Sequence, residues 1–263
     1  MATFVHMADE RLTRRILRGG IHATEFTVRA RDPALPRRGV FCVPVVASFQ
    51  TTFQWLRELK RRGHRSACGI QFRIDDAEAV FVEPVAAACR IAEQIPLAGG
   101  EVVTVLGDGR LGNLCAQVLR HQGCQVRVVG KHDFKLRILE RLDIPTIKLE
   151  DLRPTRVSDI VVDCTGSPTG LTNAMQLVRP CGTIVLKTTV AADQTLHMAP
   201  FVIDEITLLG SRCGPFADAI ELLSQGAIAV GPLLTATYPL EAATNAFEHA
   251  VRKDALKVLF AVR

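Results

Sequence analysis

The fold of this chain is set by one continuous run of residues, which reads Val102-Val103-Thr104-Val105-Leu106-Gly107-Asp108-Gly109-Arg110-Leu111-Gly112. Its first part is a short β-branched and aliphatic run, typical of a buried strand, and its second part is a G-x-G-x-x-G turn. Apolar residues then recur at helical spacing, at Leu111, Leu114, Cys115, Val118 and Leu119. The order of strand, glycine turn and helix predicts a βαβ unit in a parallel sheet.

Each glycine of this turn has a separate physical role. Gly107 permits a tight turn, Gly109 lets the backbone approach a pyrophosphate, and Gly112 lets helix and strand pack closely. Arg110 and Leu111 open the helix, whose free N–H groups and partial positive charge favour phosphates. A glycine turn without a ligand is the alternative, but the flanking strand and helix favour a ligand site. We therefore predict that all five residues bind a dinucleotide cofactor.

Downstream of this turn, short apolar runs alternate with segments of helical period. The candidate strands are 101–106, 125–129, 146–149, 159–163, 183–187 and 205–209. Helical stripes are carried by Leu136, Leu139 and Leu142, and by Phe216, Ala219, Ile220 and Leu223. Pro180-Cys181-Gly182 is expected to interrupt the chain before the strand at 183–187. Six strands complete a dinucleotide fold, so we predict an α/β chain with a doubly wound, parallel-sheet Rossmann domain.

The tip of the second strand carries the signal for cofactor choice. Gly130-Lys131-His132 stands where NAD-binding domains usually place an acidic residue that accepts the ribose hydroxyls. No carboxylate is expected there, and Gly130 with the positive charge of Lys131 and His132 leaves room for a 2′-phosphate. We therefore predict that Gly130, Lys131 and His132 bind the cofactor, with NADP favoured over NAD. The alternative is a solvated turn in which Asp133 caps the next helix or reaches the ribose.

A third segment, Asp163-Cys164-Thr165-Gly166, follows another predicted strand at the carboxyl edge, where ligands bind in open α/β sheets. Thr165 and Gly166 are therefore predicted to face the cofactor through their backbone. Cys164 could be a nucleophile, but no histidine is placed beside it in the sequence. A core thiol is the favoured interpretation.

Composition describes an ordinary globular protein, with 48% hydrophobic and 22% charged residues. The net charge of +5 is modest and no recognised motif accompanies it, so a nucleic-acid partner is not expected. We also expect no membrane partner and a cytoplasmic location, because neither a long apolar run nor a signal-type h-region is found. The eight cysteines are scattered without a CxxC pair and are predicted to be buried free thiols.

From about Asp76 to Arg263 the chain resembles the medium-chain dehydrogenases and reductases, and within them the zinc-type alcohol, polyol and threonine dehydrogenases. Besides the glycine turn, the resemblance is carried by Phe81-Val82-Glu83-Pro84, Val162-Asp163-Cys164-Thr165-Gly166, Gly182-Thr183-Ile184-Val185-Leu186, Glu205-Ile206-Thr207-Leu208-Leu209-Gly210-Ser211-Arg212, Tyr238-Pro239-Leu240-Glu241, Ala246-Phe247 and Lys257-Val258-Leu259. It implies a doubly wound cofactor domain inserted into a β-rich, GroES-like catalytic domain. We accordingly expect a truncated GroES-like domain over 1–84, the Rossmann domain over 85–215, and a segment over 216–263 that returns to the catalytic domain.

The resemblance also implies an activity and a set of site residues. Members transfer a hydride between NAD or NADP and an alcohol, polyol or carbonyl, and many use a catalytic zinc. Lys257 matches the basic residue that reaches the pyrophosphate, and Glu83 falls where polyol dehydrogenases keep a glutamate beside the zinc or its water. Glu83 is thus the candidate catalytic residue. A small-molecule alcohol or carbonyl is the expected partner, and a homo-oligomer stays open.

Residues 1–75 depart from the family pattern. The family's cysteine ligand, Gly-His-Glu segment and four-cysteine lobe are not intact, because Gly63-His64-Arg65 has the wrong third residue and Cys42 and Cys68 stand alone. No metal ligand is therefore assigned and no structural zinc is expected, although the resemblance implies a catalytic zinc. Two functions stay open: an oxidoreductase, with weak or absent activity in this chain, or a catalytically silent dinucleotide-binding protein. A zinc-independent reductase using Tyr238 is a third, but Tyr238 is expected to serve domain packing.

Overall fold

The computed structural model describes residues 2–9, 24–26, 37–39, 42–44, 67–74, 76–190 and 195–261, with side chains described from residue 78 onward. Its central element is a six-stranded sheet. The strands are β6 (Val102–Leu106), β7 (Gln125–Gly130), β8 (Thr146–Lys148), β9 (Ser158–Asp163), β10 (Val178–Leu186) and β11 (Thr207–Gly210). All neighbours are parallel, in the order β11-β10-β9-β6-β7-β8. This is the order of a doubly wound dinucleotide-binding sheet, which confirms the predicted fold class and all six strands.

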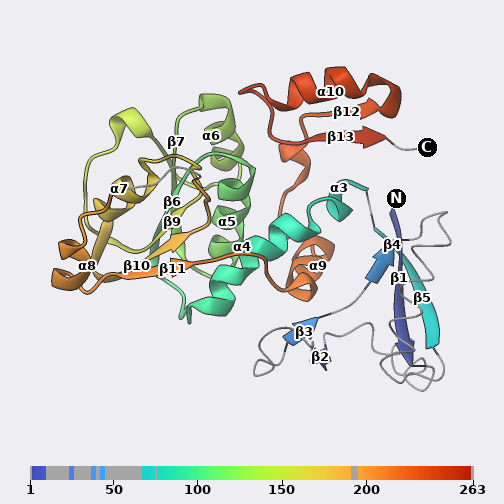
Figure 1. Ribbon diagram of the computed structural model, residues 1–263, viewed down its shortest axis with the longest axis horizontal. Helices are drawn as coiled ribbons and strands as arrows, with labels where there is room; N and C mark the ends of the chain where they lie inside the picture. Colours follow the sequence, from blue (N-terminus) through green and yellow to red (C-terminus); the bar gives the residue numbers. More distant parts are fainter. Residues whose placement is uncertain are drawn as a thin grey trace.

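Helices cover both faces of this sheet (Figure 1). The first face is packed by α4 (Val82–Gln94), α5 (Arg110–His121) and α6 (Asp133–Glu140), with α9 (Phe216–Ser224) against α4 and the short α3 (Asp76–Ala79) preceding it. The second face is packed by α7 (Gly170–Met175) and α8 (Ala199–Ile203). Strand side chains alternate between the faces, so that Val103 and Val105 join the first core and Leu106 joins the second.

The apolar stripe predicted after the glycine turn is the buried face of α5. Its fully buried side chains are Leu114, Cys115, Val118 and Leu119. The stripe predicted in α9 holds only in part, because Ala219 and Leu223 are buried whereas Phe216 is 43% exposed. Phe216 is the first residue of α9 and therefore lies at the end of the helix rather than on its buried face.

The strand expected at 183–187 begins earlier than the sequence suggests. β10 starts at Val178, and its pairing with β9 shifts register between Val178 and Thr183. The Arg179 guanidinium contacts the Asp159 carboxylate of β9 at 2.6 Å, which holds the irregular part against the sheet. Pro180-Cys181-Gly182 therefore forms a bulge inside the strand, and the expected interruption before it is wrong.

The chain beyond α9 forms a smaller unit with two parallel strands. Its elements are η3 (Gly231–Leu233), β12 (Ala236–Pro239), η4 (Leu240–Ala242), α10 (Ala243–Ala250) and β13 (Val258–Ala261). The Tyr238 hydroxyl and His249 Nδ1 are 2.9 Å apart, so Tyr238 packs β12 against α10. This contact supports the expected packing role of Tyr238.

Five strands are described in the amino-terminal part of the chain. They are β1 (Ala2–Asp9), β2 (Thr24–Phe26), β3 (Arg37–Gly39), β4 (Cys42–Pro44) and β5 (Ala67–Ile74). β1 pairs antiparallel with β4 and β5, and β2 pairs antiparallel with β3. The sequence suggests a strand over 41–50 and an amphipathic helix over 51–62; β4 falls within the first stretch, and the second lies outside the described residues. The domain boundaries stay predictions; the one expected at 84 falls inside α4. None of the helices described is long and apolar enough to cross a membrane.

Candidate functional site

The glycine turn between β6 and α5 has one closed side and one open side. Gly107 has a φ of +110° and donates its N–H to the Val129 carbonyl at 2.8 Å; a Cβ there would come within 2.9 Å of the Cys164 carbonyl oxygen. A Cβ on Gly112 would overlap the Gly107 carbonyl oxygen. Gly109, at the N-cap of α5, differs, since a Cβ there would meet nothing within 4 Å. The turn therefore packs on the sheet through its outer glycines and leaves Gly109 open to a pyrophosphate.

Two cationic side chains meet at the N-terminus of α5. Arg110 is its first residue, and its Nη1 donates to the Leu256 carbonyl oxygen at 3.3 Å. Lys257 follows that carbonyl, with its Nζ 5.9 Å from the centre of the fully buried Phe81 ring. Burial lowers the pKa of Lys257, the charge of Arg110 lowers it further, and the charge of Glu83 opposes both. Both cations add to the helix dipole, so this end of α5 suits a phosphate group.

Backbone contacts hold the carboxyl-terminal part of the chain at this site. The Thr235 N–H donates to the Lys257 carbonyl at 2.8 Å, and the Thr235 Oγ1 accepts the N–H of Leu256 at 2.8 Å. The side-chain amide of Gln117, in α5, exchanges two hydrogen bonds with the backbone of Ala229, at 2.7 and 3.2 Å. The structure thus brings Lys257 to the glycine turn; its contact with a pyrophosphate stays a prediction.

The tip of β7 differs from the sequence expectation, because a carboxylate lies there. Asp108, the second residue of the glycine turn, accepts the backbone N–H groups of Lys131 and His132 with its Oδ2, both at 2.6 Å. A Cβ on Gly130 would come within 2.5 Å of the Asp108 Cβ. The space beside Gly130 is therefore filled by Asp108. The expectation of free room and of no carboxylate at this tip is wrong.

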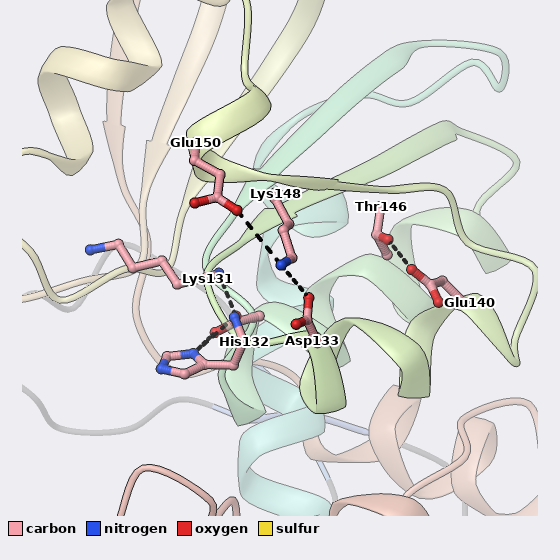
Figure 2. Close-up of polar contacts among 8 residues, drawn as sticks. Lys131, His132, Asp133, Glu140, Thr146, Lys148 and Glu150 are labelled. Atoms are coloured by element: carbon pink, nitrogen blue, oxygen red, sulfur yellow. Dashed lines mark hydrogen bonds and ion pairs between the residues drawn. The ribbon is translucent and has the colours of Figure 1, made fainter.

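Lys131 and His132 point in different directions from this tip (Figure 2). His132 Nδ1 lies 3.1 Å from both carboxylate oxygens of Asp108. Lys131 extends away from its neighbours, and its ammonium has no partner among the residues that the structure describes. Asp133 does not cap α6; its carboxylate lies 2.8 Å from Lys148 Nζ, and this contact lowers the pKa of Asp133 and raises that of Lys148. The capping alternative for Asp133 is therefore wrong.

Thr165 and Gly166 follow the carboxyl end of β9, at the same sheet edge as the glycine turn. Asp163, which is 1% exposed, accepts the Thr165 N–H at 2.9 Å and its hydroxyl at 2.7 Å. The Thr165 hydroxyl is thus engaged within the turn, which leaves backbone groups to face a cofactor. The Cys164 Sγ lies 3.9 Å from the Cys115 Sγ, and this contact together with burial raises the pKa of Cys164. A raised pKa favours the core thiol over a nucleophile.

Two other described cysteines differ from the sequence expectation. Cys181 and Cys213 are exposed, with φ of +58° and +56°, so the prediction that the cysteines are buried is wrong for them. Both have a left-handed backbone conformation and lie outside the core, which an apolar run in the sequence does not reveal.

The described part of the chain does not show whether the candidate metal ligands of the sequence lie close together. Across the described residues, no group of three or more His, Cys, Asp or Glu side chains could hold a metal ion. The side chains of Cys42, His64 and Cys68 lie outside those residues. Glu83 is described and stands exposed in the first turn of α4. Its catalytic role stays a prediction.

Asp108 is the site residue that sequence reasoning missed. A signal for it exists, because an acidic residue occupies the second position of the turn while the second strand ends in glycine without an acid of its own. Parallel strands β6 and β7 are paired from Val102 to Leu106, which brings the two loops to one edge. Reading both loops together would have placed the carboxylate at the tip.

Comparisons with known proteins agree with this geometry. Residues 111–225 match the family model described as zinc-binding dehydrogenase. The chain is 26% identical to 2-dehydro-3-deoxy-L-galactonate 5-dehydrogenase of Pseudoalteromonas atlantica, over 66% of this chain and 54% of that protein. It is 28% identical to L-galactonate-5-dehydrogenase of Escherichia coli, over 68% of this chain and 56% of that protein. The chain thus spans about half the length of these curated relatives.

A solved structure shares the fold over nearly the whole chain. It is a zinc-binding dehydrogenase structure from Sinorhizobium meliloti bound to NADP, with a TM-score of 0.67 and 17% identity over 99% of this chain and 92% of that one. The family match runs from Leu111, in the glycine turn, to Gln225, just after α9, and the shared fold includes the sheet described above. The chain is therefore similar, in sequence and in fold, to the zinc-type alcohol and polyol dehydrogenases of the medium-chain dehydrogenase/reductase superfamily.

Proposed function

We propose that this chain is an NAD(P)-dependent oxidoreductase that transfers a hydride between a nicotinamide ring and an alcohol, polyol or carbonyl compound. The observation that carries the proposal is the open Gly109 beside Arg110 and Lys257, at the N-terminus of a buried helix. The two curated relatives are named as dehydrogenases of galactonate compounds, which supports a polyhydroxylated small molecule as substrate.

The residues of this site fit a dinucleotide. Gly109 admits the pyrophosphate, the N–H groups at Arg110 and Leu111 face it, and Lys257 balances its charge. The backbone at Thr165 and Gly166 lines the nicotinamide half. When bound, the cofactor supplies the hydride acceptor or donor, and the protein supplies orientation and electrostatics.

Glu83 is proposed as the catalytic carboxylate, because it stands exposed on α4 within the electrostatic reach of Lys257. Among the described residues no group of side chains could hold a zinc ion, so no metal ligand is assigned. The second candidate function is a catalytically silent dinucleotide-binding protein. The altered ligand motifs in residues 1–75 favour it.

A glycine substitution tests the binding site directly. The Cβ that Gly109→Val adds would meet nothing within 4 Å, so the substitution should leave folding intact and block a pyrophosphate sterically. Gly210→Val is the matched control, because a Cβ at Gly210 on β11 also meets nothing within 4 Å. Calorimetric titration with NADPH and NADH should show binding to wild type and Gly210→Val and none to Gly109→Val. Equal binding by all three would refute the site.

A turnover assay separates the two candidate functions. Wild type and Glu83→Ala are incubated with NADP or NAD and a panel of alcohols, polyols and sugar acids, with and without added zinc. Turnover that is lost in Glu83→Ala while NADPH binding persists supports the oxidoreductase. Dinucleotide binding without turnover under any condition supports the silent binding protein.

A further inference from the structure

The most constrained side chain at the tip of β7 is His132. Its Nδ1 lies 3.1 Å from both oxygens of the Asp108 carboxylate, which is 9% exposed, while the imidazole itself is 33% exposed. The backbone N–H of His132 also donates to Asp108 Oδ2, at 2.6 Å. Asp108 thus holds His132 through its backbone N–H and through one ring nitrogen, and a carboxylate acceptor requires Nδ1 to carry a hydrogen. Figure 2 shows the second ring nitrogen directed away from this contact.

Fixing Nδ1 as a donor determines what Nε2 can do. In the neutral ring Nε2 is an acceptor, and in the protonated ring it is a charged donor. A ribose 2′-hydroxyl can donate to an acceptor, whereas a 2′-phosphate offers only acceptor oxygens at neutral pH. The neutral ring therefore matches the hydroxyl, and the charged ring matches the phosphate.

The charges around His132 also favour a 2′-hydroxyl when the imidazole is neutral and a 2′-phosphate when it is protonated. Asp108 faces it from the glycine turn, whereas Lys131, in its own turn, points in a different direction. Phe134 presents its ring at 6.1 Å, centre to centre. The remaining charges are Asp133, Lys148 and Glu150, with Lys148 Nζ 2.8 Å from Asp133 and 3.6 Å from Glu150 (Figure 2). With a neutral imidazole these groups carry a net negative charge, and protonation of His132 cancels it.

We propose that His132, held by Asp108, selects between dinucleotides with a 2′-phosphate and those with a 2′-hydroxyl, and that this selection depends on pH. The inference rests on the proposed dinucleotide site. The ammonium of Lys131 attracts a 2′-phosphate but not a 2′-hydroxyl. An imidazole can change its charge in the neutral range whereas an ammonium does not, so a pH dependence contributed by the protein at this tip points to His132.

The test is calorimetric titration of the full chain with NADPH and with NADH at several values between about pH 5.5 and 8. The ratio of the NADPH to the NADH dissociation constant should rise about tenfold across this range, the scale of one charge-assisted hydrogen bond. The 2′-phosphate has its own titration, so His132→Gln is the reference. In that variant the ratio of the two dissociation constants should vary with pH only as far as the 2′-phosphate itself titrates. The affinity for NADH should change little.

Two further variants separate charge from titration. Lys131→Gln is the matched control, because it removes a constant charge from the same turn; it should weaken NADPH at every pH and keep the pH dependence. Asp108→Asn keeps an acceptor for the two backbone N–H groups but frees the ring, and should favour NADPH at the upper end of the range. Thermal unfolding of each variant confirms that the fold is retained.

The outcomes distinguish this inference from the proposed function. If both dinucleotides bind wild type with a ratio that does not change with pH, or if His132→Gln keeps the full dependence, the selection by His132 is overturned while the binding site stands. If neither dinucleotide binds at any pH, both proposals fail.

Discussion

At the residue scale, the ammonium of Lys257 is placed where its charge is disfavoured. The side chain is partly buried against the Phe81 ring, and Arg110 adds a second positive charge nearby. Both lower the pKa of Lys257, with burial as the larger cause. A bound pyrophosphate would favour the charged form again, so protonation of Lys257 and binding of a dinucleotide are coupled.

This coupling predicts a loss of dinucleotide affinity at alkaline pH. Only the charged amine attracts the pyrophosphate, so affinity should be complete below the lowered pKa of Lys257 and should fall as the pH rises through it. Lys257→Arg should keep affinity to higher pH, because a guanidinium does not lose its proton in this range. Lys257→Met should bind the dinucleotide weakly at every pH. Lys253→Met, at an exposed lysine, is the control, and calorimetry measures all four proteins; the same alkaline loss in Lys257→Arg would contradict the assignment.

Thiol reactivity is a second prediction at the residue scale. Burial raises the pKa of Cys89 to about 12 and that of Cys124 to about 11, and Cys164 is shifted in the same direction by Cys115 and burial. Thiolates are the reacting species, so these cysteines should resist iodoacetamide at about pH 8 in the folded protein. The exposed Cys181 and Cys213 should be modified first. Peptide mass spectrometry gives the order, and early labelling of Cys89 or Cys164 would contradict it.

At the scale of elements, the contact between α5 and the sheet depends on one missing methyl group. A Cβ on Gly112 would overlap the Gly107 carbonyl oxygen, whereas a Cβ on Gly109, three residues earlier in the same turn, would meet nothing within 4 Å. The two glycines therefore have different roles. Gly112 serves packing of the helix, and Gly109 serves access to the turn.

Alanine substitutions at these two positions should accordingly have unequal effects on stability. Gly112→Ala forces α5 from the sheet and should lower the free energy of unfolding by about 1–3 kcal/mol, as overpacking does. Gly109→Ala should be neutral or slightly stabilising, because it restricts the unfolded chain without a clash. Urea unfolding followed by circular dichroism measures both. If both substitutions lower the free energy of unfolding equally, the cause must be something other than the packing of α5 on β6.

The elements follow from the sequence where local pattern decides them. β6, the glycine turn and α5 are recognisable because strand period, glycine spacing and helix period succeed one another without interruption. The start of β10 is not recognisable, because its pairing with β9 is irregular and is accompanied by a contact between Arg179 and Asp159 across the strands. The Asp108 carboxylate is missed for a similar reason, since it acts on the backbone of a different loop. The periodicity of a sequence does not reveal which distant residue a single side chain contacts.

At the scale of the whole molecule, the proposed dinucleotide site joins two distant parts of the chain. The glycine turn supplies Arg110, and the carboxyl-terminal unit supplies Lys257 through the backbone clamp of Thr235. Gln117 fastens the same unit to α5 at Ala229. A ligand held between Arg110 and Lys257 should therefore stabilise the attachment of the carboxyl-terminal unit.

Hydrogen exchange tests this linkage. Saturating NADPH should slow exchange of the amides of Leu256, Lys257 and Ala229, by up to about a hundredfold at a ligand concentration of about 100 times its dissociation constant. Amides of β11, at the far edge of the sheet, serve as the internal control. Lys257→Met should reduce the protection. Equal protection of β11 and of these amides would indicate a general stabilisation rather than a local clamp.

The contact between Asp108 and Gly130 also bears on how these two positions can change during evolution. Asp108 lies in the glycine turn and Gly130 ends β7, and a Cβ at position 130 would come within 2.5 Å of the Asp108 Cβ and within 2.7 Å of the Leu136 Cδ2. A descendant that gains a side chain at position 130, such as the acid that accepts ribose hydroxyls, must first lose the bulk at position 108. The two sites should therefore vary as a pair, with glycine at one wherever the other carries a side chain. Cofactor preference in this lineage would then shift by two linked substitutions, and never by the first alone.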